Sequence, residues 1–169
     1  MKQELKIVRL NTDYCDYLRK YDDKVPYNMG NKKLRPFVGV LFTVGKCLYF
    51  APLSSPRPKH LKLFDNIDLL KIDNGKLGVI NFNNMIPVYE KNVDYIYFND
   101  KKTISDKSEL KYMELLNDQL RWLNRHDNKL YRKSKFLYDS YINGNLKANV
   151  INRCCNFPLL EEKCKKYNE

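Results

Sequence analysis

The hydrophobic pattern of the chain changes its period near residue 106, and this change constrains the fold most. Before residue 106, short apolar runs alternate with turn residues, as is typical of β-strands. After residue 106, apolar residues recur at helical spacing. Strands followed by helices predict an α+β fold with a mostly antiparallel, curled β-sheet and a helix-rich C-terminal third.

The part of the chain before residue 106 predicts several short strands and one helix. Gly45 and the pair Asn74-Gly75 each lie between two apolar runs, which indicates two antiparallel hairpins. A helix through Tyr14 to Tyr21 is expected, capped by one of residues 11–13. The expected strands cover residues 5–10, 37–44, 46–53, 63–72, 77–82 and 85–89. Residues 93–98 are either one more strand or the approach to a helix.

Three helices are expected after residue 106. The first begins at Asp106, which forms a capping box with Glu109, and continues to about residue 125. The second covers residues 128–142 and ends at Gly144. A short last helix around residues 159–164 is opened by Pro158.

The charge of the chain indicates a polyanionic partner. Its 169 residues suit one domain, and 43% hydrophobic residues can form a core. A net charge of +11 on a domain of this size favours nucleic acid as the partner. No apolar run approaches the roughly 20 residues of a membrane span, and no signal peptide is evident. We therefore expect a cytoplasmic protein with no membrane partner.

The five cysteines and two histidines do not suggest a metal or disulfide framework. The cysteine number is odd and no C-x-x-C occurs, so we expect reduced thiols that pack in the core. The adjacent carboxylates Asp22 and Asp23 are expected to cap or pair rather than to bind a metal. Phosphate-binding loops of the Walker or dinucleotide type and the H-E-x-x-H zinc motif are absent. We expect neither a metal nor a cofactor.

The stretch from Tyr49 to His60 carries the strongest chemical signal. It begins as an apolar strand and ends as a loop with three prolines, which should deny the loop a helical conformation. The loop combines hydroxyl, cationic and imidazole side chains that together suit a phosphodiester. They are Ser54, Ser55, Arg57, Lys59 and His60. The alternative is a Ser/Pro-rich surface turn with incidental charges.

Several segments together resemble one known family. The sequence resembles the endoribonuclease toxins of type III toxin–antitoxin systems, the ToxN/AbiQ family, with the CptN branch as a possible closer relative. The matching stretches are collinear: Tyr14-x-x-Tyr17-Leu18 with Tyr21-Asp22-Asp23-Lys24-Val25-Pro26, Phe37-Val-Gly-Val, Ala51-Pro-Leu-Ser-Ser-Pro56 through His60, Leu77-Gly-Val-Ile-Asn81 with Met85-Ile-Pro87, and Asn156-Phe-x-Leu-Leu-Glu-Glu-Lys163.

The resemblance implies a fold, an activity and a partner. It implies a MazF/Kid-like curled antiparallel sheet wrapped by helices. It further implies metal-independent cleavage of cellular or phage RNA that leaves a 2′,3′-cyclic phosphate. Such toxins process a repeated antitoxin RNA and are inhibited by it as a pseudoknot, in closed protein–RNA assemblies. The implied biological roles are phage defence and plasmid maintenance.

The resemblance also assigns site residues. The family's active-site tyrosine falls on Tyr14, and its basic residue before the F-[VI]-G strand falls on Arg35, with Lys33 as the alternative. The hydroxyl pair falls on Ser54 and Ser55. The basic residue after the proline falls on Arg57, and Tyr27 is the candidate for a second family tyrosine. Pro58 departs from the family pattern at the point where the chain leads to Lys59 and His60.

Chemical roles follow from the transesterification that this activity requires. Arg35 (or Lys33) and Arg57 suit charge stabilisation, and the two serines suit phosphate hydrogen bonding and 2′-OH orientation. Tyr14 serves as acid or base only if its pKa falls well below about 10; otherwise it positions the nucleotide. His60 is the other proton carrier. Cations outside the loop should bind RNA: Lys101, Lys102, Arg121, Arg125, Arg132, Lys133, Lys147 and Arg153.

Two other classes of protein fit the same composition. A non-catalytic RNA-binding module would use the same cations to hold phosphates and the tyrosines to stack bases. A DNA-binding regulator is a third class, but no helix-turn-helix pattern supports it.

Overall fold

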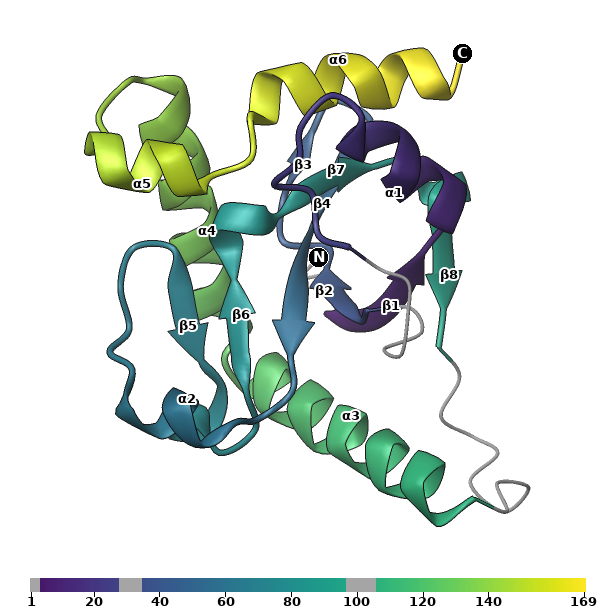
Figure 1. Ribbon diagram of the computed structural model, residues 1–169, viewed down its shortest axis with the longest axis vertical. Helices are drawn as coiled ribbons and strands as arrows, with labels where there is room; N and C mark the ends of the chain where they lie inside the picture. Colours follow the sequence, from purple (N-terminus) through teal and green to yellow (C-terminus); the bar gives the residue numbers. More distant parts are fainter. Residues whose placement is uncertain (1–3, 28–34, 97–105) are drawn as a thin grey trace.

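The computed structural model describes residues 4–27, 35–96 and 106–169. An eight-stranded sheet is its centre, with the strand order β5-β6-β4-β2-β1-β8, while β3 and β7 also pair with β4 (Figure 1). All the strand pairs are antiparallel. The strands are β1 Lys6–Leu10, β2 Phe37–Gly39, β3 Thr43–Val44, β4 Cys47–Ser54, β5 Leu69–Lys71, β6 Val79–Asn81, β7 Ile86–Val88 and β8 Val93–Tyr95.

Strand β4 joins the two halves of the sheet. Residues 47–50 pair with β3 and β7, whereas residues 51–54 pair with β2 and β6. The first half of β4 therefore has different neighbours from the second half, and one strand passes through both parts. Nearly all its side chains are buried, as expected for a strand covered on both faces. The predicted α+β class and antiparallel sheet are confirmed.

The helices lie around this sheet. Figure 1 shows α3 across one end of the sheet and α6 beside α1 at the other end. The helices are α1 Thr12–Arg19, α2 Pro58–Lys62, α3 Lys107–Arg125, α4 Asp127–Ile142, α5 Ala148–Arg153 and α6 Phe157–Tyr167, with short 3₁₀ helices η1 Ile72–Gly75, η2 Phe82–Asn84 and η3 Glu90–Asn92.

Polar side chains set the starts of three predicted helices. The side chain of Asn11 accepts a hydrogen bond from the Tyr14 amide and so caps α1. Asp106 caps α3 in the same way, and Asn156 caps α6 directly before Phe157 and Pro158. The predicted helices are confirmed, and each begins within two residues of its expected start.

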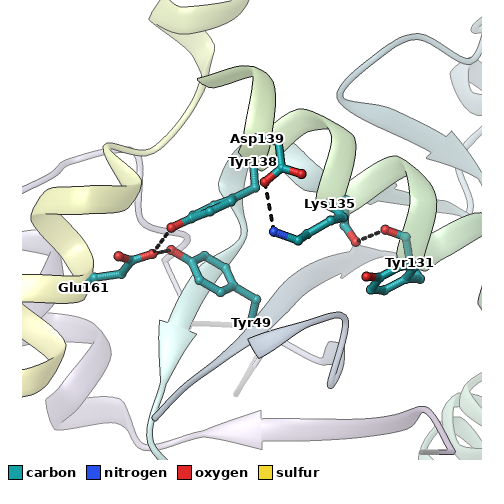
Figure 2. A network of polar contacts seen from close by, with 7 residues as sticks. Tyr49, Tyr131, Lys135, Tyr138, Asp139 and Glu161 are labelled. Carbon is teal, nitrogen blue, oxygen red and sulfur yellow. Dashed lines mark hydrogen bonds and ion pairs between the residues drawn. The ribbon is translucent and has the colours of Figure 1, made fainter. Parts of the chain in front are cut away.

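A carboxylate on α6 ties two helices to the central strand (Figure 2). Glu161 accepts hydrogen bonds from the Tyr49 hydroxyl of β4 at 2.6 Å and from the Tyr138 hydroxyl of α4 at 2.7 Å. Tyr49 is fully buried, and both tyrosines pack against Phe157. Burial and the bond to Glu161 raise the pKa of Tyr49, so its hydroxyl remains a donor. This contact holds α4 and α6 on the same part of β4.

The structure corrects the expectation that prolines keep the Tyr49–His60 loop from being helical. Pro58 is the first residue of α2, the position where its fixed φ and missing N–H do no harm. The predicted hairpin around Asn74-Gly75 is confirmed, but it is not tight. Its connection from β5 to β6 has positive φ at Asp73 and Asn74, and Leu63 to Asp68 are not in a strand. Helix α5 was not predicted from the sequence.

The cysteines are core residues as expected, and Asp22 makes structural hydrogen bonds. All five thiols are free and buried, which confirms their prediction as core residues. Asp22 accepts hydrogen bonds from the amides of Lys24 and Asn156, so it joins the turn after α1 to the residue that caps α6. No helix in the described part of the chain is long and apolar enough to cross a membrane.

Candidate functional site

A cavity of about 550 Å³ opens where β4 ends and α2 begins. Its walls come from the end of β4, the loop into α2, the start of β2, strand β6 and helix α3. Its lining residues include both hydrophobic and cationic groups: Arg35, Pro36, Leu53, Ser54, Ser55, Arg57, Lys59, His60, Leu63, Leu69, Val79, Asn81 and Tyr112. Six residues predicted for the site line this one cavity.

Backbone pairing positions Arg35 beside the serines. The carbonyl of Pro36 accepts a hydrogen bond from the Leu53 amide at 2.9 Å. Phe37 pairs with Pro52 in the β2–β4 ladder, so the residue before Pro36 lies at the end of β4. Residues distant in sequence, Arg35 and Ser54, therefore reach the same cavity.

Helix α2 brings the imidazole into the cavity wall. His60 Nδ1 accepts a hydrogen bond from the Arg57 amide at 3.1 Å, and the His60 amide donates to the Arg57 carbonyl at 2.9 Å. Because Nδ1 is an acceptor here, the neutral ring carries its proton on Nε2. Burial lowers the pKa of His60 from its usual value of 6.5, and the charges of Lys59 and Arg57 lower it further.

The cavity is electropositive. It is lined by Arg35, Arg57 and Lys59 and by no carboxylate. Within residues 4–27, 35–96 and 106–169, none of these three cations has an ion-pair partner. Burial lowers the pKa of Arg35, and the nearby charge of Arg57 lowers it further. Like charges held close together are relieved by a bound anion, and phosphate matches guanidinium geometry.

Two polar side chains of the cavity, Asn81 and Tyr112, were not predicted from the sequence. Asn81 on β6 donates from Nδ2 to the Ser54 hydroxyl oxygen at 3.4 Å, and Tyr112 enters the cavity from α3. The Ser54 oxygen therefore accepts from Asn81, which leaves the hydroxyl proton free for a ligand. Asn81 lies within the Leu77–Asn81 stretch that carried the family resemblance, so a signal existed for it. No motif pointed to Tyr112.

The structure corrects the placement of Tyr14. Its side chain is fully buried, and its hydroxyl donates to the Pro87 carbonyl at 2.5 Å. Burial raises its pKa, and the Cys164 thiol adds to the rise, which is opposite to the fall that acid–base catalysis would need. Tyr14 does not line the cavity. It is a core residue that joins α1 to β7.

The remaining predicted RNA-binding residues lie elsewhere. Tyr27 is exposed and its ring faces the Arg19 guanidinium at 4.9 Å, outside the cavity lining. Arg121 and Arg125 are exposed on α3, and Arg121 forms an ion pair with Asp118. Lys33, Lys101 and Lys102 lie outside the described residues. RNA binding by all these residues stays a prediction.

Two other predicted cations are engaged in structural contacts. The Arg153 guanidinium holds both carboxylate oxygens of the buried Asp68, at 2.9 and 3.0 Å. Lys133 donates to the Leu69 carbonyl at 2.7 Å. These contacts attach α5 and α4 to the segment around β5. Among the described residues, no group of three His, Cys, Asp or Glu side chains is placed to hold a metal ion.

Comparisons with known proteins agree over nearly the whole chain. The family described as "Toxin ToxN, type III toxin-antitoxin system" matches residues 6–165. The endoribonuclease ToxN of Bacillus thuringiensis subsp. kurstaki is 35% identical over 172 residues, covering 99% of this chain and 87% of the relative. The endoribonuclease AbiQ of Lactococcus lactis subsp. lactis is 27% identical, covering 100% of this chain and 92% of the relative.

Solved structures give the same result. A toxin structure from work on selective toxin inhibition by a non-coding RNA pseudoknot superposes with a TM-score of 0.82 at 33% identity, covering 99% of both chains. The structure of AbiQ, a lactococcal anti-phage endoribonuclease, superposes with a TM-score of 0.84 at 25% identity, covering 98% of this chain and 99% of AbiQ. The chain therefore belongs to the ToxN family of toxins of type III toxin–antitoxin systems.

Proposed function

We propose that this protein is an endoribonuclease toxin whose active site is the cavity at the end of β4. The observation that carries the proposal is the set of three cations and two serine hydroxyls in one cavity that has no carboxylate in its lining. The family membership and the curated endoribonucleases that match the chain support it. The expected reaction is attack of the ribose 2′-OH on the adjacent phosphorus, which releases the 5′-oxygen and leaves a 2′,3′-cyclic phosphate.

The cations would stabilise the charge that develops on the phosphorane. Arg35 and Arg57 line the same cavity and lie close enough for their charges to repel, so one phosphate can bind both. Lys59 adds a third positive charge at the cavity wall. Because part of this attraction grows as negative charge builds up in the transition state, these residues should affect the rate more than the binding of RNA.

The hydroxyls and the imidazole would orient the reacting groups. Ser54 can donate to a phosphate oxygen because its own oxygen already accepts from Asn81. Ser55 is more exposed than Ser54, and its hydroxyl suits a hydrogen bond that orients the ribose 2′-OH. His60 carries its proton on Nε2 while Nδ1 accepts from the Arg57 amide, so the neutral ring can donate a hydrogen bond to a phosphate oxygen. Protonation of the leaving 5′-oxygen would need the imidazolium form, which the lowered pKa of His60 disfavours.

An RNA antitoxin is the proposed inhibitor. One structural relative comes from work on selective toxin inhibition by a non-coding RNA pseudoknot, and another from work on a processed non-coding RNA that regulates a bacterial antiviral system. By analogy, we propose that a repeated RNA of this system binds the toxin in a closed assembly and is processed by it. Phage defence is the proposed role, and the cytoplasm, where RNA is made, stays our prediction for the location.

The test is cleavage of RNA in EDTA by the wild-type protein and by two single variants. We expect metal-independent cleavage with cyclic phosphate ends. Ser55→Ala or Arg35→Ala should slow it about 10²–10³-fold while the melting temperature stays unchanged. A wild-type protein that binds RNA but does not cut it would favour the non-catalytic binding module. Products with 3′-hydroxyl ends, or cleavage restored only by Mg²⁺, would contradict the proposed chemistry.

A further inference from the structure

Helix α3 places a phenol in the cavity through its buried face. Tyr112, Leu116, Gln119 and Leu123 follow one another at spacings of four, three and four residues, so they share one face of the helix. Leu116 and Leu123 are buried, and Gln119 donates to the Leu77 carbonyl at 2.8 Å. These contacts fix the rotation of α3. Tyr112, nearer the start of the helix, is thereby aimed at the cavity that holds Arg35 and Ser54.

Arg9 of β1 lies beside this phenol. Strand β1 contacts α3, the charge of Arg9 acts on the Tyr112 hydroxyl, and the Arg9 Nε atom is buried without a partner among the described residues. Arg9 itself does not line the cavity. An arginine therefore stands directly behind a tyrosine at the cavity wall.

The polarity of this contact determines where the tyrosine proton can go. A guanidinium has donors and no acceptor, so beside Arg9 the Tyr112 oxygen can act only as an acceptor toward it. The O–H proton of Tyr112 cannot point at Arg9. No described residue accepts a hydrogen bond from the Tyr112 hydroxyl within the protein. The open side of the ring is the cavity, so the proton is available to a ligand there.

We propose that Tyr112 is a catalytic residue that donates its hydroxyl proton in a hydrogen bond to a non-bridging oxygen of the scissile phosphate, and that Arg9 is the positioning residue behind it. The proposal rests on the function proposed above for this cavity. It adds a neutral donor to the cationic wall. The positive charge of Arg9 polarises the O–H bond of the phenol, which strengthens the donor.

The protonation state of Tyr112 fits this role. Burial raises its pKa, and the positive charge of Arg9 only partly opposes the rise. The phenol therefore stays protonated at neutral pH and cannot act as a base. A donor that carries no net charge adds little to long-range binding of RNA, so it should contribute mainly where the phosphate oxygen gains charge.

The test compares Tyr112→Phe with a matched control, Tyr131→Phe. Tyr131 is half exposed on α4 and does not line this cavity, so its loss should leave cleavage unchanged. Tyr112→Phe keeps the ring and removes only the hydroxyl. We expect kcat to fall about 10- to 100-fold with little change in KM and in melting temperature. A kcat equal to that of the wild type would overturn the proposal.

A phosphorothioate substrate tests which atom the hydroxyl contacts. Sulfur accepts hydrogen bonds weakly, so replacing one of the two non-bridging oxygens should slow the wild type in one stereoisomer. With that stereoisomer, Tyr112→Phe should lower kcat hardly any further, because the sulfur has already weakened the contact that the hydroxyl makes. The comparison is a double-mutant cycle between enzyme and substrate. Equal losses from Tyr112→Phe in both stereoisomers would overturn the assigned contact.

Arg9→Met tests the positioning role. It should lower kcat when Tyr112 is present and have no further effect in Tyr112→Phe, whereas a purely structural defect would slow both backgrounds equally and overturn the role of Arg9. The outcome is also distinguishable from failure of the proposed function. If Ser55→Ala is inactive and Tyr112→Phe is fully active, only the inference about Tyr112 is wrong. If both variants are fully active, the cavity is not the active site.

Discussion

Gly78 lies directly against the backbone of Ser54. A Cβ atom built on Gly78 would be 2.0 Å from the Ser54 carbonyl oxygen, and the φ of Gly78 is +103°. The same turn meets α2, because a Cβ on Gly75 would be 2.5 Å from the His60 carbonyl oxygen. The turn between β5 and β6 therefore supports both ends of the loop that carries Ser54, Arg57 and His60.

The first prediction concerns Gly78→Ala. The added methyl group must displace the Ser54 backbone, so cleavage should fall by at least 10-fold and the free energy of unfolding by about 1–3 kcal/mol. Gly144→Ala is the matched control, because Gly144 has a φ of +70° with nothing within 4 Å of its Cβ position. Gly144→Ala should lose only the free energy of unfolding that a non-glycine residue loses at a positive φ, and it should cleave RNA at the wild-type rate. Full activity of Gly78→Ala would contradict the proposed support.

Local signals made much of the fold predictable. Asn11, Asp106 and Asn156 precede helical runs and cap them, and Gly45 separates two paired strands. These features act over a few residues, so the sequence alone shows them. Short helix α2 was missed for the opposite reason. Its five residues are too few to show a helical period, and the same proline that breaks a helix interior starts one at its first position.

The site was predictable only in part, because its geometry depends on long-range packing. The loop from Ser54 to His60 is one continuous segment, so its members were found together. Tyr112 reaches them only through the packing of α3 on the sheet, which no local pattern reports. Tyr14 shows the opposite case. The sequence pattern of an amphipathic helix is the same whether its tyrosine packs in the core or lines a site. In the structure Tyr14 is buried and packs against Tyr167.

The second prediction concerns the pH dependence of stability. His60 has a lowered pKa in the folded protein, so below about pH 6.5 the unfolded chain binds more protons than the folded chain. The free energy of unfolding should therefore fall as the pH drops from about 7 toward 5. His60→Asn replaces the ring with a group that can still accept from the Arg57 amide but does not titrate. The variant should lose less stability over this range in urea unfolding series, and an equal loss would contradict the role of His60.

The third prediction concerns the Glu161 contact of Figure 2. Glu161→Ala leaves the hydroxyls of Tyr49 and Tyr138 without their acceptor, which should cost about 1.5–3 kcal/mol for each charge-assisted bond. Because Glu161 lies outside the cavity, the folded fraction should cleave RNA at the wild-type rate. Glu162→Ala, which removes an exposed neighbouring carboxylate, is the control and should change stability by less than about 0.5 kcal/mol. Equal stabilities of the two variants would contradict the structural role.

The last prediction separates the RNA-binding surface from the active site. Arg121 and Arg125 are exposed on α3, the helix that also presents Tyr112 to the cavity, so RNA that leaves the cavity along α3 would pass their charges. Removing one phosphate-binding cation should reduce the slope of log affinity against log salt by about 0.7–0.9. We therefore expect Arg125→Gln to flatten this slope for the antitoxin RNA by the amount that corresponds to a single phosphate.

Arg121→Gln should have a smaller effect, since Asp118 already neutralises part of the Arg121 charge. Lys165→Gln on α6, at the other end of the sheet, is the control of equal charge change (Figure 1). The measurement is the affinity of each variant for the antitoxin RNA across a salt series. Salt screening weakens only the charge-dependent part of binding, so the slope reports the phosphate contacts that each cation makes. If Lys165→Gln flattened the slope as much as Arg125→Gln, the RNA would follow a path other than α3. If the wild-type complex were insensitive to salt, an RNA inhibitor would be ruled out while the nuclease activity would still stand.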